Sequence, residues 1–164
     1  MPSFPRHADR SGIAALEFAL LVPVLVVIFL AVSDFGLLYY RQLQMASALA
    51  AGAEYAFTKG QSETGATLTA DVSNFVNTVS PVPATSSTAS FNGGLSATSC
   101  YCVAGSPAVF TGPLTCGAAC TDSSGSTAGK YISITGSFSY AAMFVLDQVL
   151  FPASLAQTVT VRLQ

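Results

Sequence analysis

The longest apolar stretch of the chain lies near its amino terminus. Residues 18–33 read FALLVPVLVVIFLAVS and hold no charged side chain, with Glu17 directly before them and Asp34 directly after them. A helix over this stretch would be about 24 Å long, and a few flanking residues on each side bring it to the ~30 Å of a bilayer core. The pattern therefore predicts a transmembrane helix over residues 13–40. The alternative is a buried helix of a soluble protein, but such helices are usually shorter.

The helical pattern continues beyond the apolar stretch. Residues 41–57 contain no proline, and five of their apolar side chains recur at helical spacing on one face. These are Leu43, Ala46, Ala50, Ala53 and Phe57. Gly60 is a helix stop signal, so we expect a helical extension over residues 41–60 and one continuous helix from about 13 to 58. Its second half would project from the membrane, either to pack against copies of itself or as a plain stalk.

The remaining segment, residues 61–164, mixes a helical pattern with strand patterns. Residues 67–79 place Leu68, Val72 and Val76 at helical spacing, and the prolines that follow favour an end to this short amphipathic helix. Residues 130–140 and 157–163 alternate apolar and polar side chains, which predicts two half-buried antiparallel strands.

Three other stretches of this segment give weaker signals. Residues 98–104 are a candidate third strand, and residues 84–90 form a polar linker or an edge strand. Residues 141–151 are strongly apolar and predict a short helix or loop that packs on the sheet or contacts another subunit. The expected fold class is α+β, with a long amino-terminal transmembrane helix followed by a small antiparallel-sheet domain.

Charge and composition limit the classes of function that the chain can have. Only 9% of the residues are charged and the net charge is −2, so the chain has no basic patch for nucleic acid. The single histidine, His7, precedes the membrane segment, and the acidic residues are scattered. We therefore expect that the protein is not an enzyme and that it has no catalytic site, no resident metal and no cofactor. An exported enzyme remains an alternative that would need a catalytic cluster assembled by the fold.

The residues before the apolar stretch predict the orientation. Arg6 and Arg10 place the amino terminus in the cytoplasm, so the chain beyond Arg41 would be periplasmic or extracellular, anchored in inner-membrane lipid. A secretory signal is the alternative, but its nearest small-residue cleavage motif, residues 46–48, lies inside the continuing helical pattern.

The four cysteines form two close pairs, Cys100 with Cys102 and Cys116 with Cys120. An exported domain is exposed to an oxidising compartment, which favours disulfides over a zinc site. Pairing between the two clusters is expected, either 100–116 with 102–120 or 100–120 with 102–116, and the sequence does not choose between them.

Residues 10–23, RSGIAALEFALLVP, resemble the amino terminus of TadE/TadF-like proteins, pseudopilins of the tight-adherence (Flp-type) pilus system. The resemblance rests on Gly12, on Glu17 with Phe18, and on the apolar run that contains Pro23. It covers residues 10–57 well and the carboxy-terminal strand in part.

The resemblance implies that a prepilin peptidase cuts between Gly12 and Ile13. Removal of this 12-residue cytoplasmic leader would leave 152 of the 164 residues and make Glu17 the fifth residue of the mature chain. Glu17 could then pair with the free amine of Ile13 on a neighbouring subunit, whereas without the resemblance it is a helix-start acid. Phe18 stands where the family often has tyrosine, and the chain is longer than the major pilins, so a minor pseudopilin fits better.

Two further residues are candidates for helix packing. Pro23 removes a helical hydrogen bond and predicts a kink or a loosened turn. Asp34 is read as an interfacial acid or as a partner for Arg41 of a neighbour. The predicted function is structural: a minor pseudopilin that assembles a tight-adherence pilus with other pilus subunits. An unprocessed single-pass membrane protein with an exported binding domain is the alternative, and a secreted protein cleaved near Ala48 is a further one.

Overall fold

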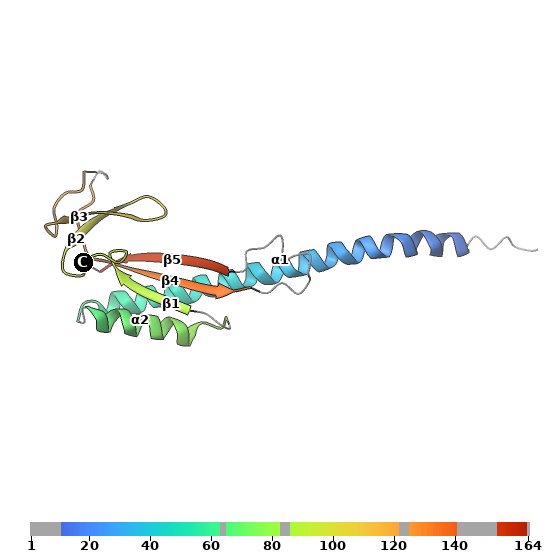
Figure 1. The fold of residues 1–164 in the computed structure, drawn as a ribbon, viewed down its shortest axis with the longest axis horizontal. Helices are drawn as coiled ribbons and strands as arrows, with labels where there is room; N and C mark the ends of the chain where they lie inside the picture. The colour runs from blue at the N-terminus through green and yellow to red at the C-terminus, as the bar shows by residue number, and fades with distance from the viewer. Residues whose placement is uncertain (1–10, 63–64, 83–85, 122–124, 141–153, 164) are drawn as a thin grey trace, which may run out of the picture.

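The protein consists of one long helix on which a small domain is built (Figure 1). The structure is a computed structural model, and it describes residues 11–62, 65–82, 86–121, 125–140 and 154–163. Its helices are α1 (Ser11–Lys59) and α2 (Ala66–Val79). Its strands are β1 (Ser86–Phe91), β2 (Cys100–Ala104), β3 (Val109–Leu114), β4 (Tyr131–Ser139) and β5 (Ser154–Arg162). The predicted α+β class, with a long apolar helix followed by small antiparallel sheets, is confirmed.

Helix α1 is continuous over 49 residues, which corresponds to about 74 Å. It therefore contains both the predicted membrane segment and the predicted extension. The helix ends before Gly60, whose N–H donates to the carbonyl oxygen of Ala56 at 2.8 Å. A Cβ atom at Gly60 would lie 2.7 Å from that same carbonyl and 3.0 Å from the side chain of Leu163, so only glycine fits this stop.

The carboxy-terminal half of α1 is covered by a three-stranded antiparallel sheet with the order β1-β4-β5. The alternation predicted for residues 130–140 is confirmed, because Ile132, Ile134 and Phe138 are buried on the face toward the helix. Met45 and Leu49 of α1 are buried beneath them. The close approach leaves no room for side chains at some positions. At Gly136, for example, a Cβ atom would lie 2.6 Å from the sulfur of Met45.

Helix α2 packs beside α1 and protects the outer edge of β1. Its apolar positions predicted from spacing, Leu68, Val72 and Val76, are all buried. Two polar side chains of α2 reach the free backbone of the edge strand: Asn77 Oδ1 accepts from the N–H of Ser87 at 3.0 Å, and Ser73 Oγ accepts from the N–H of Ala89 at 3.0 Å. The helix thereby satisfies donors that an exposed edge strand would offer to another chain.

Residues 98–104 contain a strand, but it does not belong to the main sheet. Strand β2 pairs with β3 in a separate two-stranded sheet, and a register irregularity lies between Cys100 and Cys102. The third strand of the main sheet is β1, within the segment read as a polar linker or an edge. Its sequence, SSTASF, is almost entirely hydroxyl-bearing or small, so the apolar alternation that identifies a half-buried strand is weak there.

Two disulfides hold the β2–β3 sheet to the loop that follows it. Cys100 bonds to Cys116 and Cys102 bonds to Cys120. This is one of the two pairings between the clusters that the sequence left open. The cysteines are thus joined in disulfides and do not form the alternative zinc site. Backbone hydrogen bonds between Tyr101 and Gly129 then join this unit to the residues preceding β4.

Removing one disulfide is expected to destabilise the domain. Each bond closes a loop with a sequence separation of 16 or 18 residues. In the entropic account, closing such a loop raises the free energy of the unfolded chain by roughly 3 kcal/mol. The double variant Cys102→Ser/Cys120→Ser should lose about that much unfolding free energy in denaturant titrations. A reductant should lower the stability of the unmodified protein more than that of the variant, and equal responses would contradict the expectation.

Candidate membrane and assembly helix

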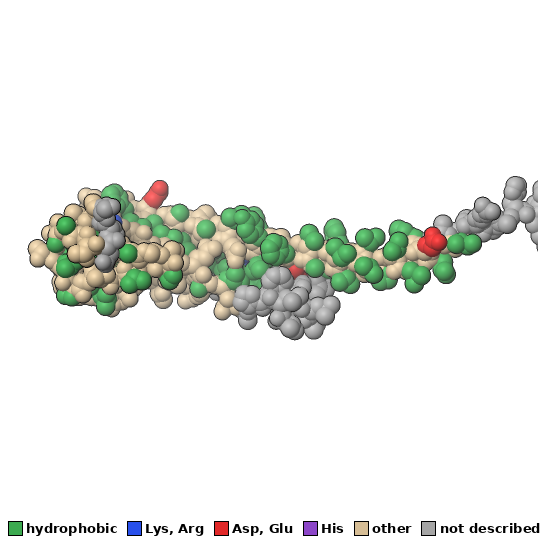
Figure 2. Space-filling model, turned by 90° about the horizontal axis from the view of Figure 1, so that it is seen from above, with side chains coloured by type: hydrophobic (Ala, Val, Ile, Leu, Met, Phe, Trp, Pro, Cys, Tyr) green, Lys and Arg blue, Asp and Glu red, His purple; other side chains and the backbone are tan. Residues whose placement is uncertain are grey.

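The amino-terminal half of α1 projects from the domain as a bare apolar rod (Figures 1 and 2). Twelve large apolar side chains between residues 13 and 32 are each 48–71% exposed. They are Ile13, Leu16, Phe18, Leu20, Leu21, Val24, Leu25, Val26, Val27, Ile28, Phe29 and Val32. Within the described residues, one helix is long and apolar enough to cross a membrane, and none of its most apolar window is buried inside the protein. Exposure of so large a contiguous apolar surface to water is unfavourable, so lipid or other apolar helices must cover it.

The predicted processing residues lie together at the exposed start of this rod. Gly12 lies in the first turn of the helix, where a Cβ would meet no atom within 4 Å apart from its chain neighbours and the adjacent helix backbone. Ile13 and Phe18 are more than half exposed. The exposed Glu17 lies one helical turn after Ile13 and therefore on the same side of the helix. The arrangement leaves both the bond between Gly12 and Ile13 and the carboxylate of Glu17 open to another protein.

Pro23 lies inside the rod, and the helix continues through it. Proline has no N–H, so the carbonyl oxygen of Ala19 has no hydrogen bond from that position. The helix therefore lacks one backbone hydrogen bond at this turn, although it stays continuous. Its side chain is exposed, as are those of most residues around it.

Asp34 marks the point where α1 enters the domain. Its side chain is only 1% exposed, and among the described residues its Oδ2 atom has no hydrogen-bond partner. The hydroxyl of Tyr140 donates to the backbone oxygen of Asp34 at 3.0 Å, and the guanidinium of Arg41 lies 5.7 Å from the centroid of the Tyr140 ring. The end of β4 is thereby tied to the helix. The role of Asp34 at a membrane surface stays a prediction.

Beyond Asp34 the helix has two apolar faces, and sequence reasoning identified one of them. The stripe that it singled out is largely exposed, with Leu43 at 52% and Phe57 at 50%. The face that builds the core is another one, and it was missed although its residues also recur at helical spacing. That core face consists of Met45, Ala48, Leu49, Gly52 and Ala56.

Chemistry-bearing side chains do not gather elsewhere in the part of the chain that the structure describes. No group of three or more His, Cys, Asp or Glu residues lies close enough there to hold a metal ion. The four cysteines are joined in disulfides. The stretch 141–151, predicted as a short helix or a contact patch, lies outside the described residues.

Comparison with known proteins agrees with this picture of the helix. Residues 12–54 match the family model described as TadE-like protein, a range that begins at Gly12 and ends within the core-building part of α1. Neither curated proteins nor solved structures give a match to the chain. The family is a structural component of pili and not a known enzyme family. The resemblance read from Gly12, Glu17 and Phe18 is therefore confirmed over the helix, and with the exposed apolar rod it indicates a single-pass membrane protein associated with the tight-adherence pilus.

Proposed function

We propose that this chain is a minor pseudopilin, a structural subunit that helps to assemble a tight-adherence pilus after cleavage between Gly12 and Ile13. The observation that carries the proposal is the exposed amino-terminal end of α1, where residues matching the TadE-like family begin a helix whose large apolar side chains lie in the open. Other pilus subunits and a prepilin peptidase are the partners this implies.

Cleavage would change the electrostatics at the end of the rod. The new amino group of Ile13 would be a positive charge that has to enter an apolar bundle, where an isolated charge is costly. Glu17 of an adjacent subunit can supply the compensating carboxylate, because its side chain is exposed one turn along the helix. A pair of this kind can also set the stagger between subunits, because only one axial offset brings both groups together.

The exposed stripe on the second half of α1 supports assembly beyond the membrane. Leu43, Ala46, Ala50 and Phe57 continue the apolar surface of the rod along the outside of the folded domain. Small side chains such as Ala46 and Ala50 let another helix approach closely. A second subunit could therefore contact the rod along much of its length.

The disulfides support an exported domain, since such bonds persist in oxidising compartments. In the proposed topology residues 1–12 are cytoplasmic, residues 13–40 cross the inner membrane, and residues 61–164 lie in the periplasm or outside the cell. The helical extension over residues 41–60 joins the membrane to that domain.

Replacing Gly12 by leucine is expected to block processing. A side chain at this position would stand directly before the scissile bond, where the peptidase must approach the backbone closely. In the native host, intact mass spectrometry should find Ile13 as the first residue of the unmodified protein and the full leader on Gly12→Leu. Gly36→Leu is the matched control, since Gly36 also lies in α1 with nothing within 4 Å of an added Cβ.

Two results would overturn the processing proposal. Retention of Met1 on the unmodified protein would favour the unprocessed single-pass protein with an exported binding domain. A mature terminus near Ala48 would instead identify a secreted protein. Deleting the prepilin peptidase in the same host should leave the full leader on the unmodified protein, as the Gly12→Leu substitution does.

A further inference from the structure

The face of the main sheet that points away from α1 is covered with hydroxyl groups. Strand register aligns three rows across β1, β4 and β5, and eight of their nine positions are serine or threonine. The rows are Ser86–Ser137–Ala156, Thr88–Thr135–Thr158 and Ser90–Ser133–Thr160. Strand propensity alone favours threonine, but it does not favour serine, so an almost uninterrupted hydroxyl surface is more than these strands require.

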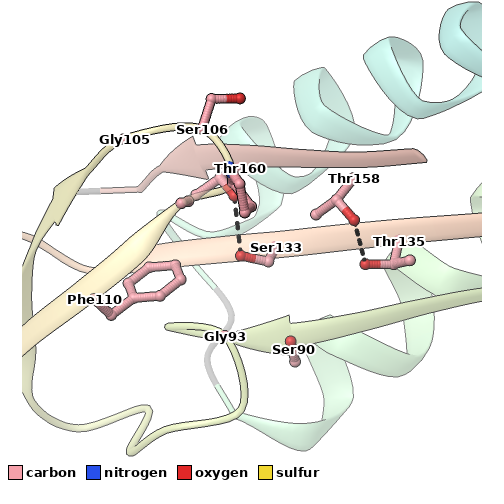
Figure 3. Close-up of a pocket in the computed structure, with 11 residues that line it drawn as sticks. Ser90, Gly93, Gly105, Ser106, Phe110, Ser133, Thr135, Thr158 and Thr160 are labelled. Carbon is pink, nitrogen blue, oxygen red and sulfur yellow. Dashed lines mark hydrogen bonds between the residues drawn. The ribbon is translucent and has the colours of Figure 1, made fainter. Parts of the chain in front are cut away.

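The β2–β3 hairpin converts part of this flat face into a cleft. Its turn, residues 105–108, stands over the sheet, and a cleft of about 690 Å³ lies between the two (Figure 3). Five sheet hydroxyls, those of Ser90, Ser133, Thr135, Thr158 and Thr160, line one wall. Ser106 from the turn also lines the cleft.

One aromatic ring completes the lining. Phe110 of β3 is half-buried at the cleft, where it packs edge-on against Tyr131 with ring centroids 6.1 Å apart. Gly93 lies against this ring, and a Cβ there would come within 2.8 Å of it. The glycine therefore leaves space for the ring beside the hydroxyl wall, and Figure 3 shows the ring next to Ser133.

The hydroxyls of the wall are only partly satisfied by one another. Ser133 pairs with Thr160 at 3.1 Å, and Thr135 pairs with Thr158 at 2.9 Å. A hydroxyl has one donor and two acceptor sites, so a pair uses one donor and one acceptor and leaves one donor and several acceptors for a ligand.

The composition of the lining selects the class of ligand. None of the residues that line the cleft is charged, so nothing there neutralises an anionic or a cationic group. A wholly apolar ligand would leave the hydroxyls of the wall unpaired, at a cost to binding. A neutral ligand with many hydroxyls and an apolar ring face matches both the polar wall and Phe110. We propose that this cleft binds a neutral oligosaccharide.

The test uses the full chain in phosphatidylcholine nanodiscs, without sugar-based detergents, against an array of neutral glucan, mannan and galactan hexasaccharides. We expect at least one of these glycans to be retained. Thr158→Val, which removes a cleft hydroxyl at nearly constant shape, should weaken that binding at least tenfold, and Phe110→Ala should do the same. Thr88→Val is the matched control, because Thr88 is an exposed threonine of the same row but lies outside the cleft. The Thr88→Val variant should bind the glycan as tightly as the unmodified protein does.

Several outcomes would overturn the proposal. They are retention of no neutral glycan, stronger retention of acidic oligogalacturonate, and equal effects of Thr158→Val and Thr88→Val. A change in oligomeric mass on Thr158→Val, with no glycan bound, would instead identify the face as a contact between copies of the chain. The proposal stands independently of processing, because the cleft lies entirely within the domain.

Discussion

Replacing Glu17 by glutamine is expected to remove the chain from assembled pili while leaving its folded domain intact. In the proposed assembly the carboxylate compensates the amino group of a neighbouring Ile13, and breaking a buried ion pair by removing one partner costs about 3–5 kcal/mol. That corresponds to a loss of more than a hundredfold in association. The measurement is the fraction of the chain recovered with sheared pili, compared with the fraction left in the membrane.

Glu54→Gln is the matched control for this experiment. Glu54 is an exposed acid of the same helix, but it lies beside the folded domain and outside the membrane segment. Its replacement should leave recovery in pili unchanged. Mass spectrometry must show that Glu17→Gln is still processed, because Glu17 is also part of the predicted processing motif. Normal pilus recovery for a processed Glu17→Gln protein would refute the pairing and leave the processing proposal standing.

Truncating Leu49 to alanine is expected to destabilise the domain strongly. Leu49 is fully buried beneath the sheet, where its methyl groups lie close to Gly136. A large-to-small change at such a site costs about 2–5 kcal/mol, because the transfer free energy is lost and a cavity remains. Chemical denaturation of the full chain in nanodiscs, followed by circular dichroism of the sheet, measures the effect.

Leu43→Ala tests whether burial is the cause. Leu43 lies on the same helix but is 52% exposed, and a surface change of this kind is expected to cost no more than about 0.5 kcal/mol. Equal losses for the two variants would mean that helix propensity, and not the contact with the sheet, controls stability. In pilus recovery the order should reverse, since Leu43 belongs to the stripe proposed to contact other subunits.

The long elements were predictable because their periodicity is strong. Helix α1, helix α2 and strands β4 and β5 all lie where the spacing of apolar residues indicated. The core face of α1 was not predictable in the same way. Beyond Asp34 the helix carries apolar or small side chains on more than one side, so periodicity identifies the helix without saying which side the sheet will cover.

The smaller features depend on contacts between distant residues. Strand β1 has few large apolar side chains and is fixed by pairing with β4 and by two side chains of α2. The disulfide pairing depends on how β2 aligns with the loop after β3, which spacing alone does not reveal. The hydroxyl-lined cleft arises only when β1, β4 and β5 come into register under the hairpin, so single strands gave no sign of it.

The continuity of α1 has a mechanical consequence. The same uninterrupted rod that carries the apolar side chains at one end forms the floor of the domain at the other, with Gly60 beyond its last turn. A pull or a twist applied to α1 beyond Pro23 would be transmitted directly to Met45 and Leu49, because the helix is unbroken between them. The domain must therefore move and rotate together with the part of α1 that carries it.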